Sequence, residues 1–100
     1  MPPRRRAKPL SPDHEAFGLA VEELRLEGGL TQEQLAERMG TTFNRVGELE
    51  RGATDSRLST LLRVSRALDL ELADVATRFR QILDGRGRDG RGGRPSQPGP

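Results

Sequence analysis

The chain has 100 residues, a formal net charge of +2 and no cysteine. This length allows one domain with a modest core. Without cysteine there is no disulfide, thiolate nucleophile or cysteine-ligated metal. No apolar run approaches the ~18 residues that a membrane-spanning helix needs, and the basic start is not followed by the apolar stretch of a secretion signal. We therefore expect a cytoplasmic protein.

The basic residues concentrate at the two ends of the chain. Residues 1–12 hold four basic residues, and residues 84–100 hold four arginines against two aspartates, so the middle of the chain is net acidic. Both ends are rich in Pro, Gly and Arg and cannot bury enough apolar surface to offset chain entropy. We predict a disordered basic arm at 1–12, a folded domain at 13–83 and a disordered tail at 84–100.

Apolar residues recur with a helical period throughout the predicted domain, and no segment shows the alternation of a strand. The spacing predicts helices over about 13–27, 31–39, 42–51 and 57–68, and a fifth helix from about residue 71. Five short helices around one core give an all-α fold.

Capping residues mark the ends of the second and third helices. Thr31 and Gln34 form the pattern of a capping box, in which each side chain satisfies a backbone N–H of the other residue. Thr42 is the expected N-cap of the third helix. Gly40 and Gly52 fit left-handed positions that end the two helices.

The two helices between about 31 and 50 have the dimensions of a DNA-binding helix-turn-helix. In that motif, the second helix inserts its N-terminal residues into the major groove. By periodicity, Phe43, Asn44, Arg45 and Glu48 lie away from the inward side of this helix. Their chemistry suits base edges, because Asn pairs with adenine, Arg with guanine, Glu with the cytosine amino group and Phe with the thymine methyl.

The stretch GLTQEQLAERMGTTFNRVGELERG at 29–52 resembles the helix-turn-helix of the Cro/C1-type (XRE-like) family. The later stretch LSTLLRVSRALDLELADV at 58–75 is similar to the fourth and fifth helices of that family. The resemblance implies a five-helix, lambda-repressor-like domain. It also implies a bacterial or phage transcriptional regulator that binds specific double-stranded DNA.

The resemblance also assigns roles to individual positions. Gln32 would hydrogen-bond a phosphate, Thr42 would cap the reading helix and touch the DNA backbone, and Arg51 with the loop 52–56 would contact neighbouring phosphates. The base-reading positions would be Phe43, Asn44, Arg45 and Glu48.

Two further pairs carry structural expectations. The resemblance implies a partly buried ion pair between Arg25 and Glu50. Burying either charge without the other would be strongly destabilising. Two half-sites one helical turn apart favour a dimer, and the apolar stripe that includes Phe79 and Ile82 is the candidate surface for a homodimer.

Two positions depart from the expected pattern. Gly47 lies inside the reading helix, where it costs about 1 kcal/mol relative to Ala, and it would allow close approach to the duplex or to the preceding helix. Arg57 occupies a capping position, so we expect Asp55 or Ser56 to cap the fourth helix instead.

Other function classes stay open or are disfavoured. The acidic middle of the chain and Glu48 also fit a protein-interaction module, such as an adaptor or an antitoxin-like subunit, which keeps the fold without tight DNA binding. The arginines of the tail offer a weaker RNA-binding alternative. The sequence shows no catalytic constellation, metal-ligand spacing or phosphate loop, so we expect neither an enzyme nor a cofactor.

Overall fold

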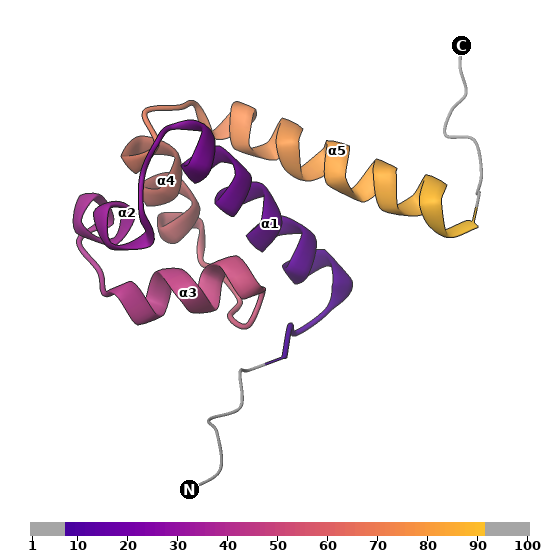
Figure 1. Ribbon diagram of the computed structural model, residues 1–100, viewed down its shortest axis with the longest axis horizontal. Helices are drawn as coiled ribbons and strands as arrows, with labels where there is room; N and C mark the ends of the chain where they lie inside the picture. The colour runs from indigo at the N-terminus through magenta and orange to yellow at the C-terminus, as the bar shows by residue number, and fades with distance from the viewer. Residues whose placement is uncertain (1–7, 92–100) are drawn as a thin grey trace, which may run out of the picture.

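The structure is a computed structural model that describes residues 8–91, with side chains up to Arg86. Within that range the chain forms five helices and no strand, as predicted (Figure 1). Parts of the predicted arm and tail, residues 1–7 and 92–100, lie outside the described residues. No described helix is long and apolar enough to cross a membrane. The helices are α1 (Pro12–Glu27), α2 (Gln32–Met39), α3 (Phe43–Arg51), α4 (Leu58–Ala67) and α5 (Leu72–Arg91).

Helix α1 lies between α5 and α3, and α2 and α4 close the other end of the molecule (Figure 1). All five helices contribute to the core, since each supplies one large side chain that is fully buried: Val21, Leu35, Val46, Val64 and Val75. Phe17 and Phe79 meet edge to face with ring centroids 5.6 Å apart, and this contact joins α1 to α5.

The capping residues fix the turn between α2 and α3. The Thr31 hydroxyl accepts from the Gln34 backbone N–H at 3.0 Å, and the Gln34 side chain accepts from the Thr31 N–H at 2.9 Å. The Thr42 hydroxyl accepts from the Arg45 N–H at 3.2 Å. Gly40 ends α2 with a φ of 72°, a left-handed conformation that favours glycine. Local sequence therefore specifies both ends of this turn, as expected.

The predicted cap of α4 is wrong. Arg57 is the N-cap residue, and no side chain, neither that of Asp55 nor that of Ser56, hydrogen-bonds the first turn. The Asp55 carboxylate instead lies 3.0 Å from Nε2 of His14, at the start of α1. Asp55 therefore contacts α1, and the first turn of α4 has no side-chain cap.

Described residues outside 13–83 also take part in helices and contacts. Helix α5 continues through residues 84–91, which were predicted to be disordered. Its Arg86 side chain lies 3.4 Å from the Glu15 carboxylate. At the other end, the Leu10 N–H donates to the Gly52 carbonyl at 2.8 Å, and Ser11 caps α1. Leu10, Ser11 and Arg86 therefore contact the helices of the predicted domain.

Candidate nucleic-acid interface

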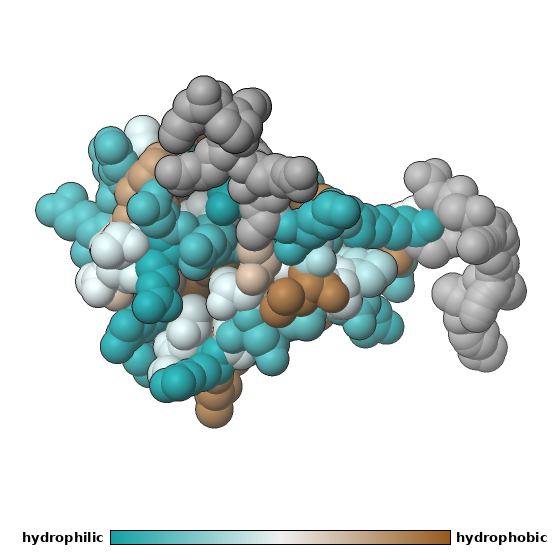
Figure 2. Space-filling model, turned by 90° about the horizontal axis from the view of Figure 1, so that it is seen from below, coloured by the Kyte–Doolittle hydropathy of each residue, from teal (hydrophilic) through white to brown (hydrophobic). Residues whose placement is uncertain are grey.

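The N-terminal half of α3 points away from the core. Val46 and Leu49 are buried on the inner side of the helix, whereas Asn44, Arg45 and Glu48 are exposed. Phe43 leaves 51% of its surface exposed, which is high for a large apolar residue. Figure 2 views the molecule from below Figure 1, on the side of α3, and hydrophilic residues dominate this face. We call Phe43, Asn44, Arg45 and Glu48 the reading face.

The remaining predicted contact residues lie at the two ends of this helix and beside it. Thr42 is exposed and caps α3, so its hydroxyl is engaged with the Arg45 N–H. Arg51 is half-buried at the C-terminal end of α3, and its Nε is buried with no hydrogen-bond partner among the described atoms. Gln32 is half-buried at the first position of α2.

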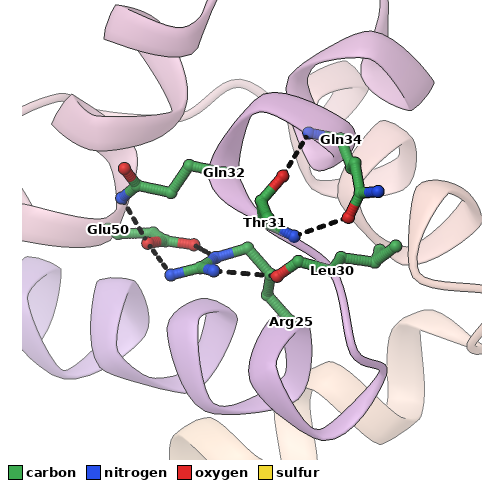
Figure 3. Close-up of polar contacts among 6 residues, drawn as sticks. All are labelled: Arg25, Leu30, Thr31, Gln32, Gln34 and Glu50. Atoms are coloured by element: carbon green, nitrogen blue, oxygen red, sulfur yellow. Dashed lines mark hydrogen bonds and ion pairs between the residues drawn. The ribbon is translucent and has the colours of Figure 1, made fainter.

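Arg25 of α1 and Glu50 of α3 form a buried, two-pronged ion pair (Figure 3). Nε and Nη2 of Arg25 donate to the two carboxylate oxygens of Glu50 at 2.7 and 3.0 Å. Nη1 of Arg25 donates to the Leu30 carbonyl at 2.9 Å. The hydrogen bond that Arg25 donates to Glu50 raises the pKa of Arg25 more than burial lowers it, so the guanidinium stays charged. The pair fixes the angle between α1 and the end of α3.

Gln32 joins this pair, which the sequence did not predict. Its Nε2 donates to the Glu50 carboxylate at 2.8 Å, so α1, α2 and α3 meet at one carboxylate (Figure 3). An amide nitrogen carries two N–H donors. One Gln32 donor is therefore held by Glu50, and the second is available to another acceptor.

Gly18 lets α1 approach the end of α3. A Cβ at this position would collide with the backbone carbonyl oxygen of Glu50 and would lie 2.6 Å from that of Leu49. Only glycine fits such a contact, since backbone atoms cannot move aside as a flexible side chain can. The sequence showed Gly18 inside a helix but could not show what lies against it.

The arginines divide into two groups by their partners. In α5, Arg78 binds the Glu23 and Glu27 carboxylates of α1 at 3.1 and 2.7 Å. The other described arginines of α5 also have carboxylate partners. Between α2 and α4, in contrast, six arginines make no ion pair with any described carboxylate: Arg38, Arg45, Arg51, Arg57, Arg63 and Arg66. We call these six the free arginines.

A polar hollow lies between the start of α3 and α4. It has a volume of about 480 Å³, and three of the free arginines line it: Arg45, Arg57 and Arg63. The hydroxyl-bearing residues Ser59 and Thr60 of α4 also line this hollow. The Asp55 carboxylate lines the hollow too, beside His14. Three guanidinium groups against one carboxylate leave a cationic excess, which suits an anion such as a phosphate.

An apolar hollow of about 340 Å³ lies on the other side of α4, against α1 and α5. Its walls include Phe17, Leu61, Leu72 and Phe79. Phe79 and Ile82, predicted to belong to a dimer surface, are both half-buried within the chain itself. The described residues contain no cluster of His, Asp and Glu that could hold a metal ion.

Comparisons with known proteins agree with this geometry. Residues 21–75 match the helix-turn-helix family model. An uncharacterized HTH-type transcriptional regulator of Methanothermobacter thermautotrophicus is 45% identical over 51 residues, which cover 51% of this chain and 74% of that protein.

Two solved structures share the fold. The clp gene regulator ClgR of C. glutamicum superposes with a TM-score of 0.69 at 30% identity, over 73% of this chain and 95% of that one. The restriction-modification controller protein C.AhdI of Aeromonas hydrophila gives a TM-score of 0.63 at 37% identity, over 65% of this chain and 98% of that one. These matches confirm the family resemblance seen in the sequence. The chain belongs to the Cro/C1-type helix-turn-helix family of DNA-binding transcriptional regulators.

Proposed function

We propose that the chain reads a specific double-stranded DNA sequence by inserting the N-terminal half of α3 into the major groove. The observation that carries the proposal is the pairing of a buried inner side of α3 with a reading face that is exposed and unengaged. Arg45 pairs with no carboxylate among the described residues, so no ion pair seen in the structure has to break before it binds DNA. The wide major groove admits a helix in this orientation.

Phosphate contacts would position α3 in the groove. The second N–H of Gln32 is available while Glu50 holds the first. The N-terminus of α2 adds unpaired backbone N–H groups that favour an anion. Thr42, the N-cap of α3, would touch the DNA backbone at the other end of the turn. Phosphates on the flank of the groove would meet Arg57 and Arg63 in the polar hollow.

The protein would act as a homodimer on two half-sites. The apolar hollow beside Phe79 exposes side chains that a second copy would cover. Leu58, the first residue of α4, is 66% exposed and shares a helix face with Leu61, which lines that hollow. A two-fold contact would place the Leu58 of each copy against the hollow of the other copy. Ile82 would flank this contact from α5.

The DNA proposal is tested by selection from a random duplex library with the purified protein. The expected result is an enriched motif, for which Arg45→Ala weakens binding by about 1–3 kcal/mol and relaxes preference at one base pair. Arg78→Ala is the matched control, because it removes an arginine that is paired on α1. No enriched motif, together with binding that disappears at physiological salt, would favour a protein-interaction module instead.

The dimer is tested by sedimentation equilibrium at micromolar concentration. We expect a dimer for the unmodified chain and a monomer for Leu58→Arg. Leu26→Arg is the control, since Leu26 is 60% exposed on α1 and does not line the hollow. A monomeric unmodified chain would refute the dimer, and equal effects of the two substitutions would refute this surface.

A further inference from the structure

The side chain of Arg51 folds back along α3 and lies over Gly47. A Cβ built on Gly47 would lie 3.2 Å from Nη1 of Arg51, and no other atom outside the local helix backbone comes within 4 Å of it. Gly47 itself is buried. Side chains of a helix lean over the preceding turn, toward its N-terminus. The Arg51 guanidinium therefore covers the place where residue 47 would carry its side chain.

This position belongs to the outer side of α3. Asn44, Gly47, Glu48 and Arg51 follow one another at intervals of three and four residues, so they share one side of the helix. Val46 and Leu49 occupy the opposite, buried side. The guanidinium of Arg51 therefore lies one turn closer to the reading face than the Arg51 backbone does.

The guanidinium of Arg51 is partly buried against Gly47 and makes no ion pair with a described residue. Within residues 8–91 its buried Nε meets no hydrogen-bond acceptor, and no described carboxylate pairs with the side chain. The terminal nitrogens of Arg51 therefore remain available to a ligand. An arginine fork matches the O6 and N7 acceptors of guanine in the major groove.

We infer that Arg51 reads a guanine edge through the space left by Gly47, and does not serve only as a phosphate contact. The inference rests on the proposed insertion of α3 into the major groove. It also explains a glycine in the middle of a reading helix, where helix propensity disfavours it. Gly47 would then be a positioning residue, because it acts through Arg51.

The test repeats the library selection with Arg51→Lys and Gly47→Ala. Lysine keeps the charge of arginine but lacks the planar fork. We expect Arg51→Lys to lose about 5- to 100-fold of the preference for G at one base pair, while the dependence of binding on salt stays unchanged. We expect Gly47→Ala to relax the same base pair, since a Cβ only 3.2 Å from Nη1 of Arg51 would make the guanidinium shift from its place over residue 47.

Gly85→Ala is the matched control for the glycine substitution. Gly85 also lies inside a helix, and a Cβ there would meet nothing within 4 Å. Both alanine variants should keep or raise the thermal midpoint, because alanine favours helix, and only Gly47→Ala should change the motif. A thermal midpoint that holds while the motif changes separates positioning from a loss of fold.

The outcomes distinguish this inference from the proposed function. A motif that Arg51→Lys leaves intact at every base pair overturns the base-reading role and leaves the helix insertion standing. A motif that Gly47→Ala leaves unchanged overturns the positioning role of the glycine. The absence of any motif for the unmodified chain overturns the proposed function, and the inference fails with it.

Discussion

The arginines on the two sides of this molecule differ in whether they pair with carboxylates. On the side of α1 and α5, the described arginines of α5 face carboxylates, as Arg78 does with Glu23 and Glu27. On the side of α2, α3 and α4, the free arginines have no carboxylate partner among the described residues. A net charge of +2 hides this division. A candidate DNA surface is thus marked less by the number of its cations than by their lack of internal partners, because an internal pair competes with phosphate.

The two sides meet at the end of α3. Gly18 brings α1 against the Glu50 backbone, and the Glu50 carboxylate binds Arg25 of α1 and Gln32 of α2. This cluster links α1 and α2 to the end of the helix that would enter the groove. The predictions below test that division, starting with the largest expected effect.

Glu50→Ala should have the largest effect on stability. It leaves the Arg25 guanidinium buried without its partner, and breaking a buried pair on one side costs about 3–5 kcal/mol. Denaturant unfolding measures the free energy. Glu23→Ala, which removes an exposed carboxylate from the α1–α5 side, should cost far less. Equal losses for the two variants would contradict the central role of the buried cluster.

Gly18→Ala should destabilise the contact between the two sides. Although alanine favours helix, the added Cβ meets backbone carbonyls that cannot rotate away, and overpacking of this kind costs about 1–3 kcal/mol. The thermal midpoint should fall, whereas Gly85→Ala should leave it unchanged or raise it. A stable Gly18→Ala variant would show that α1 does not rest directly on α3.

Arg57→Ala and Arg63→Ala should change the salt dependence of DNA binding. Each would remove one phosphate contact, so the slope of log K against log salt should fall in size by about one unit per variant. The base preference should remain. Arg80→Ala carries the same change of charge on α5, where Arg80 pairs with Asp84 at 3.6 Å, and should leave the slope unaltered. A similar slope change for Arg80→Ala would mean that only the total charge matters.

Glu27→Gln should have the smallest effect, and that effect should depend on pH. The hydrogen bond from Arg78 lowers the pKa of Glu27 below its ordinary value of 4.5. A carboxyl with a lowered pKa in the folded state stabilises the fold above its unfolded pKa, and this contribution is lost as pH falls through the folded pKa. The thermal midpoint of Glu27→Gln should therefore be slightly lower than that of the unmodified chain near neutral pH. The two midpoints should converge in strong acid, where Glu27 is protonated and the pairing is lost. A difference that grows in acid would contradict the pairing.

Much of the fold could be predicted from the sequence because its signals are local. Helical periodicity located five helices, and the Thr31–Gln34 capping box and Gly40 placed the turn. The family resemblance implied the Arg25–Glu50 pair, whose side chains do meet. The contacts of the reading face with DNA stay predictions. The sequence did not predict that Gln32 donates to the Glu50 carboxylate, since no local rule links the start of α2 to the end of α3.

The sequence by itself determined both ends of α2 and α3, since the caps and periods that mark them act over three or four residues. Only the tertiary structure decided which arginines have partners and which remain free. Arg86 and Glu15 are 71 residues apart in the chain but meet in the fold. Whether Arg51 has room to lie over Gly47 was likewise settled by packing. Charge counts are properties of a sequence, whereas charge pairing depends on distances that only folding sets.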